Sequence, residues 1–423
     1  MRVLWFTNTP SLAAHLWGNR PLGGGWIESL EREVKARSAI ALGICFLSPK
    51  PMKPFETDGV RYYPMCNGGG VVQRWFDRLT GKYPLQKDLK SMLDAITDFK
   101  PDLIHIHGTE MHFGLLQEHI LLPSLVSIQG NLTACVERYY GSIPGRRYLR
   151  YLRPRHLYSF DNPYFHGRKM QKKSSDERRI LMRSTHIAGR TEWDKDITRV
   201  FSPVSQYYII NEILRAPFYN ACWDKKRGPV YHILTTTSNA AYKGFEVILK
   251  TARLLRDYGL NFQWCVVGVG EDMVTVKAAQ DWLRISHKAV GVFLPGPLEA
   301  GDIVSRLLDS DVYVQVSHVE NSSNSLCEAM LVGIPVIASY AGGTSSIVRQ
   351  DVEGLLYQDG DAVSLAGKIL KLSADEKMGR QMGARARQTA LIRHEPGKVV
   401  REVEMVYREI LNQNTSQIIQ KIK

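Results

Sequence analysis

Apolar runs of strand length alternate with segments of helical periodicity along the chain. The first run, RVLWFT, precedes a loop with Gly23, Gly24 and Gly25, and WIESLEREVKA then has the apolar spacing of a helix. IALGICFL, DLIHIHG and SLVSIQG follow as predicted buried strands. A strand, a glycine turn and a helix open a doubly wound parallel sheet, in which ligands bind at the carboxyl ends of the strands.

A second cycle of the same pattern follows a stretch rich in turn and charged residues. VYHILTT, FQWCVVGVG, DVYVQVS and IPVIAS are predicted strands, and KGFEVILKTARLLRDYG is a predicted helix. A chain of 423 residues exceeds one ordinary hydrophobic core. We therefore expect an α/β protein with two Rossmann-like domains that face a cleft. The expected parts are an N-terminal domain (1–210), a linker (211–229), a C-terminal domain (230–395) and a final helix (396–423) that could pack back on the first domain.

The positive charge of the chain is concentrated in one window. The net charge is +13, and residues 138–183 contribute 13 Lys or Arg against three acidic residues, a net +10. Aromatic and cationic residues alternate there, as in GRRYLRYLRPRHLYSF. Three interpretations stay open: a solvated surface insertion, a patch for anionic lipid, and a nucleic-acid surface. The last is the weakest, because no recognition motif accompanies the charge.

The cysteines and the N-terminus indicate the compartment. The six cysteines form no CxxC pair, which favours buried thiols in a reducing cytosol over a disulfide framework or a zinc site. MRVLWFTNTP lacks the features of a signal peptide, and no run reaches the roughly 20 apolar residues that span a bilayer. We expect a cytoplasmic protein, either free or peripheral on the inner face of the cytoplasmic membrane.

The candidate chemistry lies in HVENSSNSLCEAMLVGIPVIASYAGG, where Glu320 and Glu328 are separated by seven residues. A helix is predicted to begin near Asn321 to Ser325, and the amides of a helix start bind phosphate well. Glu328 then falls one turn into the helix, within reach of a ribose, while Glu320 lies at the strand end. The alternative is a helix cap and a solvated glutamate. The following Pro335, the strand and the paired glycines favour the binding site.

This region resembles the EX7E region of the family 4 retaining glycosyltransferases, which have the GT-B fold. FLPGPLEAGDIVSRLLDSDVYVQVS and EGLLYQDGD extend the resemblance over about the last 200 residues, whereas the first domain resembles the family more loosely, through its glycine loop and PDLIHIHG. The resemblance implies transfer of a sugar from a nucleoside diphosphate donor, such as a UDP sugar, to a hydroxyl with retained configuration. The implied setting is the synthesis of cell-surface polysaccharide or of a lipid-linked saccharide.

The resemblance also implies roles for individual residues. Lys243 matches the phosphate-binding lysine, whose cation would stabilise the leaving diphosphate. Glu320 matches the glutamate that faces the donor sugar and Glu328 the one that binds ribose. The diphosphate would receive backbone amides from Asn324, Ser325 and Leu326. Gly24 and Gly25 would line the donor phosphate or the acceptor, and Pro297 and Leu298 the base.

The chain departs from the family at two positions. An arginine usually precedes the lysine, but TTTSNAAYKG has Thr237 and Ser238 there, and Arg190 is our guess for the second cation. Gln129 stands where the family often has a histidine. Among the histidines of the preceding strand and loop, His105, His107 and His112, we select His107 as the catalytic candidate.

No metal or other cofactor is expected. The strings DKD (194–196) and DSD (309–311) could hold a metal through carboxylates, but the fold resembled here usually works without one. The expected partners are the nucleoside diphosphate sugar, a saccharide or lipid-linked saccharide acceptor, and an anionic membrane surface at 138–183, with no nucleic acid.

Two other functions stay open. A nucleotide-sugar epimerase of similar fold would act without an acceptor. A basic nucleic-acid-binding protein would explain the charge but not the glutamate pair.

Overall fold

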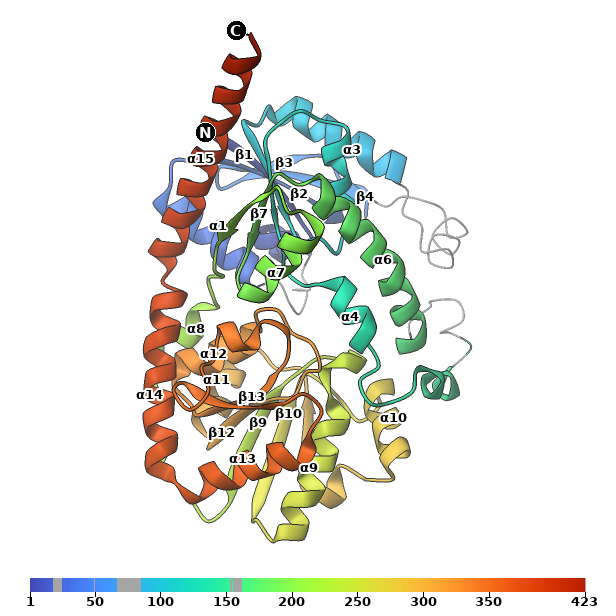
Figure 1. Cartoon of the computed structure of the whole chain (residues 1–423), viewed down its shortest axis with the longest axis vertical. Helices are drawn as coiled ribbons and strands as arrows, with labels where there is room; N and C mark the ends of the chain where they lie inside the picture. Colours follow the sequence, from blue (N-terminus) through green and yellow to red (C-terminus); the bar gives the residue numbers. More distant parts are fainter. Residues whose placement is uncertain (18–24, 49, 67–84, 153, 155–161, 423) are drawn as a thin grey trace. The chain divides into compact units, whose positions relative to one another are not determined.

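The computed structural model describes residues 1–17, 25–48, 50–66, 85–152, 154 and 162–422 (Figure 1). The chain forms two compact units. Unit 1 consists of Met1–Thr133, Gln171–Ile213 and His394–Lys423, and unit 2 consists of Ala134–Met170 and Leu214–Arg393.

Unit 1 contains an eight-stranded sheet in the order β3-β4-β2-β1-β5-β6-β7-β8. All neighbouring strands are parallel except the antiparallel pair β3 and β4. The strands are β1 (Arg2–Thr7), β2 (Ala41–Ser48), β3 (Phe55–Thr57), β4 (Val60–Cys66), β5 (Leu103–His107), β6 (Ser124–Ser127), β7 (His186–Gly189) and β8 (Gln206–Ile209).

Two apolar clusters pack against this sheet. One joins β1, β2 and β4 to α1 and α15, and the other joins the strands to α3, η2 and α6. The helices are η1 (Ser11–Trp17), α1 (Gly25–Arg37), α3 (Leu85–Phe99), η2 (His112–Glu118), α4 (Leu132–Arg138), α6 (Pro163–Arg183), α7 (Glu192–Phe201) and α15 (Pro396–Ile422). Of these, α4 and α6 each run from one unit into the other.

Unit 2 contains a six-stranded parallel sheet in the order β11-β10-β9-β12-β13-β14. Its central strands are almost fully buried, as near-continuous apolar runs are in parallel sheets with both faces covered. The strands are β9 (Tyr231–Thr236), β10 (Phe262–Val267), β11 (Val292–Gly296), β12 (Val312–Gln315), β13 (Val336–Tyr340) and β14 (Gly354–Gln358).

Helices cover the unit 2 sheet in two groups (Figure 1). One apolar cluster includes residues of α9, α10 and α13, and the other includes residues of α8, α11, α12 and α14. The elements are η3 (Gly145–Tyr151), α8 (Ala216–Asn220), η4 (Ala241–Lys243), α9 (Phe245–Tyr258), α10 (Val274–Leu283), η5 (Lys288–Val290), α11 (Ala300–Leu308), α12 (Asn324–Val332), η6 (Gly342–Ser346), α13 (Ala362–Ala374) and α14 (Glu376–Arg393).

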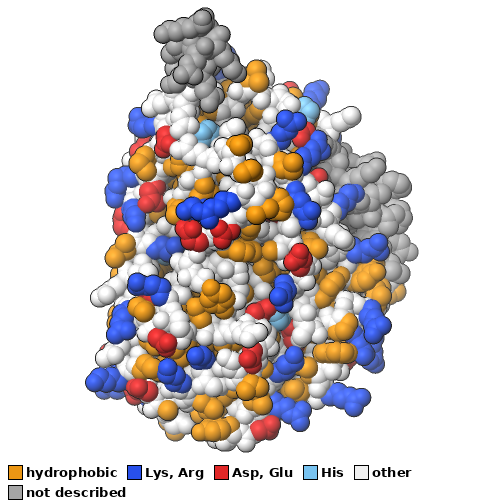
Figure 2. Space-filling view, viewed as in Figure 1, with side chains coloured by type: hydrophobic (Ala, Val, Ile, Leu, Met, Phe, Trp, Pro, Cys, Tyr) orange, Lys and Arg blue, Asp and Glu red, His pale blue; other side chains and the backbone are white. Residues whose placement is uncertain are grey.

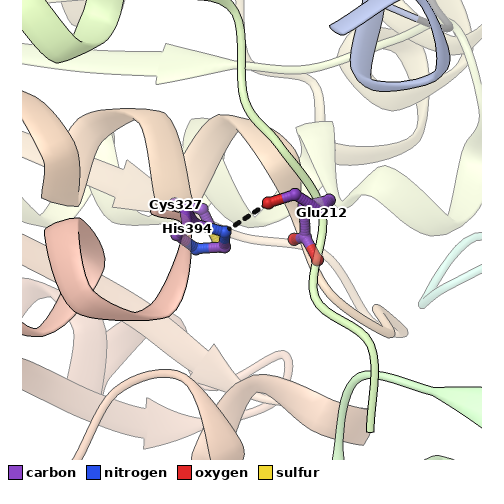
Figure 3. Close-up of side chains that lie close together, drawn as sticks. All are labelled: Glu212, Cys327 and His394. Atoms are coloured by element: carbon purple, nitrogen blue, oxygen red, sulfur yellow. Dashed lines mark hydrogen bonds between the residues drawn. The ribbon is translucent and has the colours of Figure 1, made fainter. Parts of the chain in front are cut away.

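Two parallel α/β units are the fold class that the sequence predicts. The chain passes between units at Ile213 and Leu214, close to the predicted end of the first domain at 210. The units are not continuous in sequence, however, because 134–170 lies in unit 2. The segment from His394 lies in unit 1, where the His394 Nδ1 is 2.8 Å from the backbone oxygen of Glu212 (Figure 3).

The basic window 138–183 is therefore divided between the two units. On the face shown in Figure 2, Lys and Arg side chains are interspersed with Asp and Glu. In the part of the chain that the structure describes, no helix combines the length and the apolar character needed to cross a bilayer.

Candidate functional site

The helix start predicted to hold phosphate is the N-terminus of α12 in unit 2. The helix begins at Asn324, and its N-cap, Ser323, does not cap the backbone amides of the first turn, since its hydroxyl instead lies 3.2 Å from that of Ser325. The first amides of a helix have no partner within the helix, so those of Asn324, Ser325 and Leu326 can donate to an anion. The Oδ1 atom of Asn324 is buried and accepts no hydrogen bond from the described part of the chain.

The structure brings Lys243 and Glu320 together. The Nζ of Lys243, at the end of η4, donates to Oε1 of Glu320, and the Ser317 hydroxyl donates to the same oxygen over 2.9 Å. Burial alone would lower the pKa of Lys243, but the Glu320 carboxylate outweighs it and the pKa is raised. Lys243 is therefore a fixed cation beside the loop between β12 and α12 that carries Glu320.

A glycine allows this approach. Gly244 follows Lys243 and has a φ of +76°, and a Cβ there would lie 2.1 Å from the Val316 backbone oxygen. Any side chain at 244 would separate the start of α9 from the end of the β12 strand. The Lys-Gly pair thus places a cation where the chain passes close to the loop of Glu320.

Glu328 lies one turn inside α12 and forms a bidentate ion pair with Arg215. The Nε and Nη2 atoms of Arg215 each donate to one Glu328 oxygen over 2.7 Å. The Glu328 side chain is 5% exposed and that of Arg215 is 33% exposed. Burial raises the pKa of Glu328, and the Arg215 guanidinium opposes that rise without cancelling it. A carboxylate has about four lone-pair sites, so this pair leaves two for other donors.

Pro297 and Leu298, predicted to line the base, follow β11 in the same unit. Pro297 is exposed, and Leu298 is half-buried against the apolar cluster of α11 and α12. Unit 2 therefore contains every residue predicted for the donor except Gly24, Gly25 and Arg190.

His107 lies at the end of β5 in unit 1. It lines a pocket there with Trp26, Arg190 and Asn211. Its ring centroid is 3.7 Å from that of His105 and 4.8 Å from that of Trp5, and neither ring nitrogen has a hydrogen-bond partner among the described residues. Burial, with His105 and Arg190 nearby, lowers the pKa of His107 well below its ordinary value. The imidazole is therefore neutral at pH 7, able to accept one hydrogen bond and donate another.

Arg190, the guessed second cation, has partners within unit 1. Its Nε is 3.4 Å from Glu212 Oε2, and its guanidinium lies 4.4 Å from the centre of the Trp26 ring. Of the two predicted loop glycines, Gly25 begins α1, and Gly24 lies outside the described residues.

Both acidic strings have structural partners. Asp194 forms a capping box with Thr191 at the start of α7. Asp309 ends α11, and Asp311 accepts from Lys225 over 2.5 Å and from the backbone amide of His232 over 2.7 Å. Helix capping explains the carboxylate of Asp194, and ion pairing explains that of Asp311.

Two groups near the site carry no signal in the sequence. Arg215 falls in the stretch predicted to be a linker, and its partner is 113 residues away. His318 precedes Glu320 by two residues, and its ring lies 2.7 Å from both Glu246 Oε1 and Asp359 Oδ1. Their basis is long-range packing, which spacing along the chain does not indicate.

Part of the chain matches a known family, and the whole chain resembles solved structures in fold. Residues 227–389, which include the Lys243–Glu320 and α12 region, match the family model for glycosyl transferases group 1. The chain is similar to a sucrose-phosphate synthase from Thermosynechococcus elongatus, with a TM-score of 0.72 and 15% identity over 97% of this chain and 99% of that one. The solved structures that are similar to this chain are GT-B glycosyltransferases, and the chain has their two-domain α/β fold.

Two curated relatives are sugar transferases by name. The amylovoran biosynthesis glycosyltransferase AmsK of Erwinia amylovora is 31% identical over 34% of this chain and 36% of its own length. The GDP-mannose-dependent alpha-mannosyltransferase of Mycolicibacterium smegmatis is 26% identical over 82% of this chain and 83% of its own. The chain spans 33 to 37% of the length of three curated relatives, AmsK among them.

Proposed function

We propose that the protein is a glycosyltransferase that moves a sugar from a nucleoside diphosphate donor to a hydroxyl, with retention of the anomeric configuration. The observation that carries the proposal is the grouping within unit 2 of a fixed cation, a helix start and two carboxylates: Lys243, the first turn of α12, Glu320 and Glu328.

Each part has a task in the proposed reaction. The α12 amides and Lys243 bind the diphosphate and stabilise the charge that grows on it as the glycosidic bond breaks. The remaining lone pairs of Glu328 accept the ribose hydroxyls, and Glu320 faces the donor sugar. The departing phosphate accepts the acceptor proton, so the proposed reaction needs neither a histidine base nor a metal.

Unit 1 supplies the proposed acceptor side. The neutral imidazole of His107, with Trp26 and Asn211, lines a small cavity with room for about one water molecule, and the proposal places the acceptor at the surface of this unit. The names of the relatives support an acceptor in cell-surface polysaccharide synthesis. The basic window supports a lipid-linked acceptor reached from an anionic membrane surface.

Thermal stabilisation tests the donor site. The purified protein is heated with UDP, GDP, ADP and dTDP and with their sugars. We expect one nucleotide to raise the melting temperature, because a ligand that binds only the folded state stabilises it. Glu328→Gln should abolish most of that shift, whereas Glu271→Gln, a surface change in the same unit, should keep it. No shift with any nucleotide would overturn the proposal.

A further inference from the structure

Residues 134–152, here called the strap, begin within α4 and belong to unit 2, although the chain before them belongs to unit 1. Tyr139, Ile143 and Tyr148 are at most 4% exposed and belong to the apolar cluster that also contains α9 and β9. The Tyr139 ring lies 5.9 Å from that of Tyr242, the neighbour of Lys243. The strap is therefore part of the core of the candidate donor unit.

A buried polar cluster joins the strap to this unit. The amide and the hydroxyl of Ser142 donate to Glu246 Oε1 over 3.0 Å and 3.1 Å. The same oxygen is 2.7 Å from His318 Nε2, and His318 Nδ1 is 2.7 Å from Asp359 Oδ1. Three distant parts of the chain thus meet at one imidazole, whose side chain is 5% exposed.

Gly141 fits the strap onto this cluster. Its φ is +57°, and a Cβ there would lie 2.6 Å from both Glu246 Oε1 and His318 Nε2. A side chain at 141 would therefore meet the two groups that hold the strap. This position tests the contact from the side of the strap.

The cluster holds its imidazole as a cation between two carboxylates. Burial alone would lower the pKa of His318, but the hydrogen bonds to Asp359 and Glu246 outweigh it and raise the pKa to about 9. Other charged or titratable groups around it are Arg138, 3.8 Å from Asp359, and Lys250, 3.2 Å from the Ser142 hydroxyl. The buried Tyr148 and Tyr357 also lie within electrostatic reach of Glu246. A neutral residue at 318 would leave the buried Glu246 and the partly buried Asp359 without their shared cation.

The same histidine is bonded to the segments that carry the candidate site. Its backbone amide donates over 2.8 Å to the backbone oxygen of Tyr242, the residue directly before Lys243. Ser317 donates to Glu320, and the Ser339 hydroxyl donates to the Ser317 oxygen over 2.6 Å. From the strap side, the Cys135 thiol lies within electrostatic reach of Lys243. A shift of the imidazole would therefore move both members of the Lys243–Glu320 pair.

We propose that His318 is a positioning residue that fastens the strap to unit 2 and thereby fixes Lys243 and Glu320 for sugar transfer. The role in transfer rests on the proposed function. The attachment of the strap stands on the contacts alone. His318 does not touch the reacting atoms in this proposal and acts through the segments it holds.

Hydrogen exchange in the full chain tests the attachment. His318→Gln and Gly141→Ala should each raise amide exchange by about tenfold or more in the strap and in 241–245 and 316–321, because local opening becomes easier. His318→Lys, which restores a cation, should return most of the protection. His287→Gln is the matched control, since His287 is also buried in unit 2 but hydrogen-bonds Gln280. Unchanged exchange in both test variants would overturn the proposal.

A binding and turnover measurement tests the positioning. With the nucleotide sugar that stabilises the wild type best, His318→Gln should lower kcat for donor hydrolysis about tenfold, since small misplacements of reacting groups are costly. The Kd of the corresponding nucleoside diphosphate should change less than about threefold. A looser strap with unchanged kcat and unchanged exchange at 316–321 would show a purely structural contact. If the wild type binds no nucleotide, the proposed function fails, and the exchange data still decide the attachment.

Discussion

At the scale of single residues, the Arg215–Glu328 pair determines the charge of the candidate ribose site. Burial raises the pKa of Glu328, and Arg215 contacts both of its oxygens. Arg215→Gln should raise that pKa further, so that a larger fraction of Glu328 is protonated as the pH falls and the side chain loses acceptor capacity. We expect nucleoside diphosphate binding about tenfold weaker at pH 6 than in the wild type, recovering towards pH 9, as measured by calorimetry.

The matched control is Arg227→Gln, because Arg227 donates only to the backbone oxygens of Leu372 and Ser373. The double variant Arg215→Gln, Glu328→Gln should bind no more weakly than Glu328→Gln alone, since the arginine acts through the glutamate. Equal affinity of Arg215→Gln and wild type from pH 6 to pH 9 would refute this role.

The sequence predicts the residues of this site better than their partners. The spacing of Glu320 and Glu328 beside a helix start is local, and the structure places Glu328 in α12 as predicted but Glu320 in the loop between β12 and α12, five residues beyond the strand. Arg215 and Lys243 are separated from their carboxylate partners by 113 and 77 residues in the sequence. Only the folding of unit 2 brings these partners together. Arg190, predicted as the second cation, has Glu212 and Trp26 as partners in unit 1, which the sequence does not indicate.

At the scale of elements, His318 links stability to pH. Its pKa is raised to about 9 from 6.5, so its stabilisation is complete below about pH 6.5 and is lost as the pH rises towards 9. A shift of this size corresponds to about 3 kcal/mol at most. The difference in melting temperature between wild type and His318→Gln should therefore be large at pH 6 and small at pH 9.5.

The pH series should stay above about 5.5, because the lowered pKa of Glu246 adds a loss of stability in acid. His287→Gln serves again as control and should show no such trend. A difference between wild type and His318→Gln that is constant from pH 6 to pH 9.5 would contradict a charged imidazole.

Elements with a regular period were predictable, and the strap was not. IALGICFL and DVYVQVS correspond to β2 and β12 because buried parallel strands are continuous apolar runs. Tyr139, Ile143 and Tyr148 have no helical or strand period, and their burial depends on unit 2, which is formed by residues much later in the chain. Because Lys and Arg residues surround these three side chains in the sequence, the sequence predicted an exposed surface for the whole segment.

At the scale of the whole molecule, the discontinuous units predict which segments respond together. The strap shares a core with β9 and α9, although strands of unit 1 flank it on both sides in the sequence. A nucleotide that binds unit 2 should therefore slow amide exchange in the strap and in β9 by similar factors, because both open with the same cooperative unit. Peptides from β1 and β2 in unit 1 provide the internal reference and should change least. If amide exchange in the strap changes as it does in unit 1 instead, the apolar contacts between the strap and α9 do not govern the opening of the strap. The attachment at His318 would then lose its energetic basis.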